Sequence, residues 1–432
     1  MSADTVAILG FFVLFALMLL RVPIGMAMGL VGVSGFAYLT SGSAALKIVG
    51  HTTMRTVTDF NFAVIPLFLL MGSLATTSGM SRELFRAANA FLGHLRGGLG
   101  IATIAACGGF SAICGSSVAT AATFSRVAYP EMRRFGYPKS FSTGVIAAGG
   151  TLGIMIPPST VLAVYGLITE QDIGKLFIAG VIPGVLAIAM YMISVTIIGF
   201  ARTGFLPAGN RTSWRERIAS LRDVWATILL FAFVIGGIYG GMFTATEAAG
   251  MGAGGAFILG VLRRRLSVED VLRSLLEATR TTAAVFTILI GALLFGYFLT
   301  VTQTPQKVTA FLTGLGIGSY GVLTLILLLY LVLGCLMDAL AMIILTVPII
   351  FPVIKELGFD PIWFGIIIVM TVELGLIHPP VGMNIFVIKS VIDDVKISTI
   401  FAGVLPFILT DLLRLAILVM FPILALWLPS HM

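Results

Sequence analysis

The chain contains one short segment twice, about 222 residues apart, and both copies lie in strongly apolar sequence. Residues 153–158 read Gly-Ile-Met-Ile-Pro-Pro, and residues 375–380 read Gly-Leu-Ile-His-Pro-Pro. The similarity continues downstream, where residues 179–183 match residues 402–406 after a shift of one position. A repeated helix that is interrupted by prolines within apolar sequence is typical of the binding site of a secondary transporter.

The composition indicates a protein that crosses the membrane many times. Of 432 residues, 58% are hydrophobic and 10% are charged, and the mean hydropathy is +1.09. Soluble domains carry about 25% charged residues. The net charge of +7 comes from basic residues between apolar runs, so it indicates membrane topology rather than a nucleic-acid partner. The three cysteines show no metal-binding spacing and are interpreted as packing residues.

Basic residues concentrate in four segments, which the positive-inside rule places in the cytoplasm. These segments are 82–96, 126–139, 202–222 and 263–280. The first two align with 304–318 and 348–361, which are nearly neutral. Equivalent segments that differ in this way predict two halves, 1–222 and 223–432, inserted with opposite orientations.

Inverted halves require an odd number of crossings each, and the apolar runs give five per half. Both chain ends then lie in the periplasm. The predicted fold is an all-α polytopic membrane protein with two inverted repeats. The predicted spans are 5–20, 22–40, 60–80, 140–168 and 176–201 in the first half, and 225–242, 245–262, 281–303, 362–389 and 397–428 in the second.

Two further apolar stretches, 98–125 and 317–350, lie between loops assigned to the same side, so each is predicted to be a re-entrant hairpin. Proline pairs should break the helices at 140–168 and 362–389, because proline lacks an amide donor and clashes with the preceding turn. Freed carbonyls within the membrane need partners and can coordinate a cation. The helix N-termini that follow the breaks can attract an anionic substrate.

Acidic residues within apolar runs are costly and usually functional or paired. Asp338 lies at the predicted tip of the second hairpin and is assigned a functional role. Glu373 either receives freed backbone amides or tunes an ion site. Glu247 is interpreted as a helix cap, and Asp411 with Arg414 as a neutralising pair at i,i+3 spacing.

These residues also resemble a known family, the large membrane subunit of tripartite ATP-independent periplasmic (TRAP) transporters of the C4-dicarboxylate type. The resemblance extends over essentially the whole chain. It is carried by segments such as Arg-Val-Pro-Ile-Gly at 21–25, Gly-Ser-Ser-Val-Ala-Thr-Ala at 115–121, Thr-Glu-Ala-Ala at 246–249 and Pro-Pro-Val-Gly-Met-Asn at 379–384. The order and spacing of these segments, rather than any single one, make the resemblance specific.

The resemblance implies an elevator-type importer with sodium as the coupling ion and no other cofactor. It places a first sodium site at Ser111, Gly115, Ser116, Gly153, Ile156 and Pro158. It places a second at Gly334, Asp338, Gly375, His378 and Val381. Ser117, Ser159 and Asn384 fall in the vicinity of the substrate. His378 departs from the family pattern, in which this position is commonly threonine, and imidazole is a poorer match for a hard cation.

The resemblance further implies a small membrane subunit of about four helices, a periplasmic substrate-binding protein and a location in the bacterial inner membrane. One rival is a stand-alone sodium- or proton-coupled dicarboxylate symporter, which needs no binding protein. An intramembrane enzyme is a second rival, but it requires a cluster of catalytic side chains that the dispersed acids and histidines do not supply. A passive channel is a third rival. The substrate stays open among dicarboxylates, keto acids and sugar acids.

Overall fold

The computed structural model describes residues 1–201, 205–209 and 211–431. These residues are almost entirely helical, and the only β-pairing among them is an isolated bridge between Arg96 and Ala208. The first-half helices are α1 (Ala3–Leu19), α2 (Ile24–Leu39), α3 (Gly42–Thr58), the 3-10 helix η1 (Phe60–Ala63), α4 (Val64–Thr77), α5 (Met80–Leu92), α6 (Gly98–Cys114), α7 (Ser117–Arg134), α8 (Lys139–Met155), α9 (Thr160–Thr169), α10 (Ile173–Ala201) and α11 (Trp214–Asp223).

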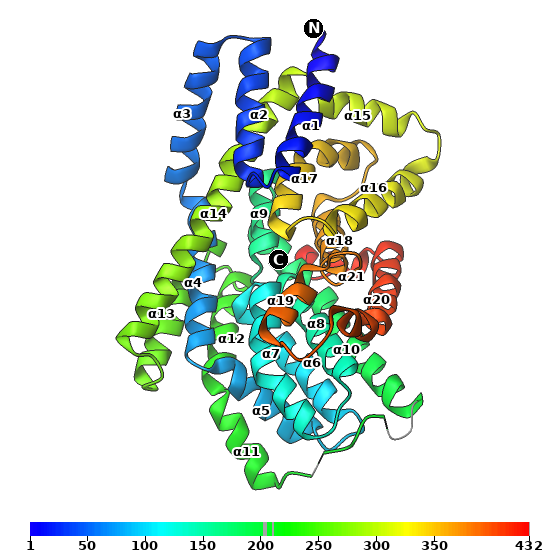
Figure 1. Ribbon diagram of the computed structural model, residues 1–432. Coiled ribbons are helices and arrows are strands. Elements are labelled where there is room, and N and C mark those ends of the chain that lie inside the picture. The colour runs from blue at the N-terminus through cyan, green and yellow to red at the C-terminus, as the bar shows by residue number, and fades with distance from the viewer. Residues whose placement is uncertain (202–204, 210, 432) are drawn as a thin grey trace.

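The second half repeats this order. Its helices are α12 (Trp225–Tyr239), α13 (Ala245–Leu262), α14 (Val268–Val301), α15 (Thr304–Thr313), α16 (Gly318–Gly334), α17 (Ala339–Glu356), α18 (Pro361–Gly375), α19 (Met383–Val391), α20 (Ile397–Met420), α21 (Ile423–Leu426) and η2 (Pro429–His431). The starts of α7 and α17 are 222 residues apart, as are those of α8 and α18. The equivalent helices α5 and α15 lie at opposite ends of the molecule (Figure 1), which supports the proposed inversion of the halves.

The prediction of an all-α polytopic membrane protein is confirmed. Among the described residues, seven helices are long and apolar enough to cross a membrane, and a bent pair raises this number to eight. The bent pair is α11 with α12, which meet at 49°. Five shorter apolar helices include the first arms of both predicted hairpins, α6 and α16.

Several predicted boundaries are wrong. The second hairpin arms, α7 and α17, continue to Arg134 and Glu356, so much of the basic segment 126–139 is helix rather than loop. Arginines in the last turn of α7 suit the negative end of the helix dipole, which favours the longer helix. The helix predicted at 281–303 already begins at Val268, because Ser267 and Asp270 form a capping box there. Residues 42–58, which lie in no predicted span, form the helix α3, and it is not among the helices apolar enough to cross a membrane.

The basic segments meet at one end of the molecule. Arg263 donates two hydrogen bonds to the Glu83 carboxylate, at 2.8 and 2.9 Å, and so joins the fourth segment to the first. Arg82, Arg126 and Arg265 line one surface pocket. Arg202, at the start of the third segment, lies outside the described residues. The shared position of these segments agrees with their assignment to the same side of the membrane.

The centre of the protein is built from α8 and α18. Nearly every residue of α8 from Phe141 onward is buried, and the same holds for α18 from Trp363 onward. Backbone that leaves the helical pattern at membrane depth must be shielded from lipid by protein. The two helices that carry the proline pairs satisfy this requirement, because the rest of the fold surrounds them.

Candidate ion and substrate site

The first hairpin turns and the first helix breaks where the sequence predicts. Between α6 and α7, Gly115 adopts a left-handed conformation with φ of 61°, which favours glycine. The Ser116 side chain then caps α7 by accepting a hydrogen bond from the amide of Ala119 at 3.3 Å. Helix α8 ends at Met155, and α9 begins at Thr160 after the proline pair.

This hairpin tip lies directly against the break. A Cβ atom on Gly153 would be 2.5 Å from the Ser116 carbonyl oxygen, and one on Gly115 would be 2.8 Å from that of Pro158. The Thr160 hydroxyl also donates a hydrogen bond to the Gly115 carbonyl oxygen at 3.1 Å. Of the remaining residues assigned to the first sodium site, Ser111 is buried one turn before the tip, and Ile156 caps the end of α8. Tip and break thus approach each other closely through their backbones.

The second tip and break repeat this arrangement. A Cβ atom on Gly375 would be 2.6 Å from the carbonyl carbon of Gly334, so only glycine allows this close approach. Asp338 caps α17 by accepting the Leu340 amide at 3.1 Å, in the position that Ser116 occupies in the first half. Val381 lies just before Gly382, the N-terminal cap of α19. The second half therefore presents a carboxylate where the first presents a hydroxyl.

The imidazole of His378 contacts the neighbouring backbone and the second hairpin tip. Its Nδ1 lies 2.7 Å from the Pro379 carbonyl oxygen, a distance at which a protonated Nδ1 donates a hydrogen bond. The same nitrogen lies 3.6 Å from the sulfur of Cys335 at the hairpin tip. The ring therefore bridges the break and the tip. This geometry favours a site in which backbone oxygens, rather than the ring, supply the cation ligands.

The two halves meet at the residues assigned to the substrate. Ser117, at the start of α7, donates to the Asn384 side-chain oxygen at 2.9 Å, and both side chains are buried. Asn384 belongs to α19, the half-helix that follows the other break. Ser159 instead caps α9 and donates to the Ile154 carbonyl at 2.5 Å. Two of the three predicted substrate residues are thus in direct contact.

The predictions for the acidic residues are confirmed in part. Glu247 forms a capping box with Thr244, as predicted. Asp411 and Arg414 do pair, with 3.0 Å between carboxylate oxygen and guanidinium nitrogen. The expectation that Glu373 receives freed backbone amides is wrong, because its carboxylate instead pairs with Arg414 at 2.9 Å. A charge as deeply buried as Glu373 binds the nearest opposite charge more strongly than a backbone dipole.

At the basic end, Asp394 ties the two halves together. The carboxylate in this loop between α19 and α20 accepts from Lys139 at 2.7 Å and from the Tyr129 hydroxyl at 2.9 Å. The hydrogen bond from Lys139, with a further contribution from Tyr129, holds the pKa of Asp394 below its usual value. Asp394 is thus ionised at neutral pH, and it links α7 and α8 to the segment that follows the second break.

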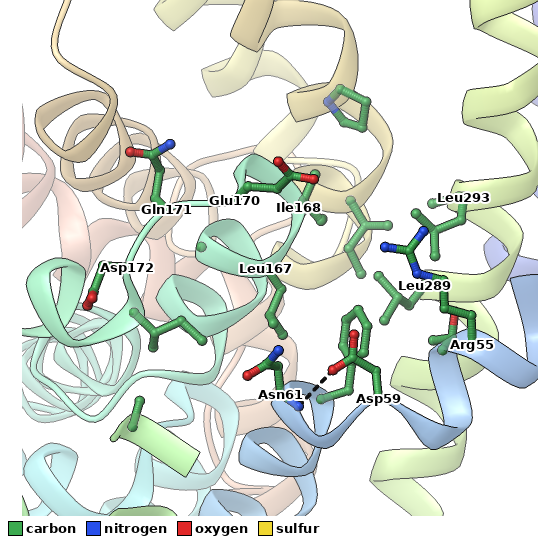
Figure 2. A pocket seen from close by; sticks show the side chains of 18 of the residues that line it. Arg55, Asp59, Asn61, Leu167, Ile168, Glu170, Gln171, Asp172, Leu289 and Leu293 are labelled. Carbon is green, nitrogen blue, oxygen red and sulfur yellow. Dashed lines mark hydrogen bonds between the residues drawn. The ribbon is translucent and has the colours of Figure 1, made fainter. Parts of the chain in front are cut away.

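A cavity of about 1000 Å³ separates the helices that carry tips and breaks from the helices beside them. In Figure 2, Glu170, Gln171 and Asp172 follow α9 on one side, and Arg55, Asp59 and Asn61 lie opposite at the end of α3 and in η1. Leu289 and Leu293 of α14 complete that opposite wall. None of the predicted sodium ligands lines this cavity. It therefore marks a gap between two groups of helices rather than the ion site.

Comparisons with known proteins decide the family. Residues 11–424 match the DctM component of the tripartite ATP-independent periplasmic transporter. The C4-dicarboxylate TRAP transporter large permease protein DctM of Pseudomonas aeruginosa is 40% identical over 389 residues, 90% of this chain and 89% of that protein. The chain belongs to the TRAP transporter large permease family. This membership confirms the resemblance that the sequence motifs indicated.

Other large permeases are similar over nearly their full length. The DctM protein of Rhodobacter capsulatus is 34% identical, with 98% of this chain and 99% of that protein covered. A sialic acid TRAP transporter large permease protein, SiaM of Vibrio cholerae, is 32% identical, with 94% and 95% covered. The YdaH transporter of Alcanivorax borkumensis, whose topology is described as unusual, has a TM-score of 0.61 at 16% identity and covers 91% of this chain and 90% of its own. That last likeness concerns the fold alone.

The close approaches at the two breaks lead to a first prediction for this TRAP permease. Replacing Gly375 with Ala inserts a methyl group 2.6 Å from backbone, where nothing can rotate away. We expect a loss of about 1–3 kcal/mol of stability from overpacking and at least a tenfold loss of uptake. Gly254→Ala in α13 is the matched control, because no atom lies within 4 Å of its added Cβ. Normal uptake by Gly375→Ala would show that the tip and the break need not touch.

Proposed function

We propose that this chain is the transporting subunit of a sodium-coupled importer of small organic anions. One observation carries the proposal: each hairpin tip meets a broken helix so closely that only glycine fits between the backbones. Backbone carbonyls released by the breaks supply the oxygen ligands that a hard cation prefers. The N-termini of α9 and α19 supply positive dipole ends for a carboxylate.

The proposed transport cycle is an elevator movement of the central helices. The two tips and both breaks share helices α6 to α9 and α16 to α19, which pack across the halves. Ser117 of α7 contacts Asn384 of α19, and Tyr165 of α9 stacks edge-on against Phe351 of α17 at 6.3 Å. These contacts support movement as one body. The cavity beside them supports a boundary along which that body slides.

The proposed partners are a small membrane subunit and a periplasmic substrate-binding protein, both as separate chains. Relatives named for C4-dicarboxylates and for sialic acid share a similar large permease. Substrates of different size served by similar permeases agree with a binding protein that selects the substrate. We therefore propose that this chain carries a small organic anion, a carboxylate, with the rest of the molecule set by the partner.

The proposed location is the bacterial inner membrane, with both chain ends in the periplasm. The experiment is labelling of single engineered cysteines from outside intact cells. Arg215 and Lys307 are both exposed and lie near the N-terminal ends of α11 and α15. We expect a cysteine at 307 to react with a membrane-impermeant reagent and one at 215 to react only after the cells are opened. Strong outside labelling at 215 would contradict the inverted topology.

Uptake into liposomes tests the function itself. We expect a sodium gradient to drive uptake only when the small subunit and the loaded binding protein are both present. Sodium-driven uptake by this chain alone would instead support a stand-alone symporter. Omitting one component at a time separates the two outcomes.

A further inference from the structure

A continuous chain of buried polar side chains connects the two helix breaks. It begins at Thr151 on α8, two residues before Gly153, and ends at Glu373 on α18, two residues before Gly375. Between them lie Tyr191 on α10, and Asp411 and Arg414 on α20. All five side chains are fully buried, with exposed fractions of 0%.

Each link of the chain is a direct contact. The Thr151 and Tyr191 hydroxyls are 3.2 Å apart, and the Tyr191 hydroxyl also donates to Asp411 at 2.6 Å. Asp411 lies 3.0 Å from the Arg414 guanidinium, which donates to Glu373 at 2.9 Å. The guanidinium also lies over the Tyr191 ring, 5.6 Å from its centre. No link in this sequence of contacts depends on an intervening atom.

The two ends of the chain are equivalent positions of the internal repeat. Thr151 aligns with Glu373, and Tyr191 aligns with Arg414 once the one-residue shift after the breaks is included. The Thr151–Tyr191 pair is therefore the neutral counterpart of the Glu373–Arg414 ion pair. Asp411 has no polar equivalent, because the matching position is Ile188. This additional carboxylate is the residue that joins the two pairs into one chain.

We infer that this series of five buried side chains couples the two ion sites, so that binding of an ion at one break favours binding at the other. The inference rests on the proposed sodium sites at the breaks. Thr151 and Glu373 each lie two residues before the glycine of a break, and the side chains between them are charged or hydrogen-bonded groups in a low-dielectric interior. A shift of either residue strains the same contacts, because a buried charge that loses its partner is costly. All five are positioning residues, and none is assigned as an ion ligand.

The decisive variant is Tyr191→Phe. It removes the hydroxyl that joins Thr151 to Asp411 and keeps the ring, which packs edge-on against Phe407 at 5.7 Å. The matched control is Ser194→Ala, which removes a different hydrogen bond between the same two helices, from Ser194 to Thr410 at 2.6 Å. Each variant loses one hydroxyl between α10 and α20, fully buried at Tyr191 and half-buried at Ser194, but only Tyr191→Phe interrupts the series of contacts.

The first measurement is initial uptake against sodium concentration in proteoliposomes with both partner proteins. We expect a sigmoidal curve for the parent and for Ser194→Ala. For Tyr191→Phe we expect the Hill coefficient to fall towards about 1, with half-saturating sodium raised about fivefold to tenfold, at the lower end of the usual range of coupling between sites. A merely structural role predicts a lower maximum with an unchanged curve shape, and that result would refute the coupling.

A second measurement does not depend on transport. Cys114 and Cys335 lie at the first and second tips and are both buried, so a small maleimide reaches each thiol only when its tip opens, and its rate of reaction reports on each site separately. In a background lacking Cys107 and Cys335, we expect Asp338→Asn at the second site to raise the sodium concentration that protects Cys114. Adding Tyr191→Phe should abolish this effect. An equal effect of Asp338→Asn with and without Tyr191 would refute the coupling.

The failures of the two proposals are distinguishable. A parent protein whose uptake and cysteine reactivity both ignore sodium would refute the proposed function, and the coupling with it. A sodium-dependent parent whose curve is unchanged by Tyr191→Phe would refute the coupling alone.

Discussion

Replacing Asp338 with Asn is expected to remove most sodium-dependent uptake while the protein still inserts and folds. Asp338 caps α17 through one carboxylate oxygen, and asparagine caps helices about as well as aspartate. The substitution therefore removes the charge and keeps the turn. Losing a charged ligand should raise half-saturating sodium about tenfold or more, equivalent to about 1.4 kcal/mol. Each sodium ion that is no longer transported inward also removes about 2.3 kcal/mol of driving force per 100 mV of membrane potential.

The matched control is Asp360→Asn. Asp360 caps α18 through hydrogen bonds from the amides of Ile362 and Trp363, but it is exposed and distant in sequence from the tip. Its substitution should leave the sodium curve unchanged. His378→Thr should also retain sodium coupling, because we propose that backbone oxygens supply most of the ligands of the site. An unchanged sodium curve for Asp338→Asn would remove this carboxylate from the mechanism.

Replacing Arg414 with Ala is expected to have the largest effect on stability. Its side chain is fully buried between the carboxylates of Glu373 and Asp411. Removing one partner of a buried ion pair costs about 3–5 kcal/mol, because the remaining charge stays buried without compensation. Arg414 compensates two such charges, so we expect little folded protein in a detergent thermal-denaturation assay.

Two further variants identify the cause of that loss. Adding Glu373→Gln and Asp411→Asn to Arg414→Ala removes the uncompensated charges and should restore much of the folded protein. Arg273→Ala breaks an exposed ion pair with Glu269 and should change stability by less than about 1 kcal/mol. Stability of Arg414→Ala equal to that of Arg273→Ala would show that the buried charges are compensated in another way.

The sequence predicts the unusual parts of this fold better than its ordinary parts. Glycine followed by a proline pair breaks a helix through covalent geometry, so the breaks before Thr160 and Met383 could be located from a single chain. The hairpin tips follow from Gly115, Ser116 and Asp338, whose residue types suit a turn and a cap. Local chemistry determines each of these features.

Helix ends and long-range pairs depend on more than local chemistry. Helix α3 carries His51 and Arg55, so its sequence lacks the apolar run that predicts a helix in this protein, and it is placed by packing on α2 and α14. The pairing of Glu373 with Arg414 joins residues 41 positions apart, and nothing in the local sequence specifies it. The internal repeat contains one indication of this pairing. It aligns Arg414 with Tyr191, and the Arg414 guanidinium lies over the Tyr191 ring.

In the proposed mechanism, two sodium ions bind where the tips meet the breaks, and the sodium gradient drives import. The most direct measurement is initial uptake of a carboxylate by proteoliposomes that contain this chain, the small subunit and the loaded binding protein. We predict uptake with an inward sodium gradient, none with a pH gradient alone, and a Hill coefficient for sodium above 1. Uptake driven by a pH gradient in the absence of sodium would contradict the claim and would assign the coupling to protons.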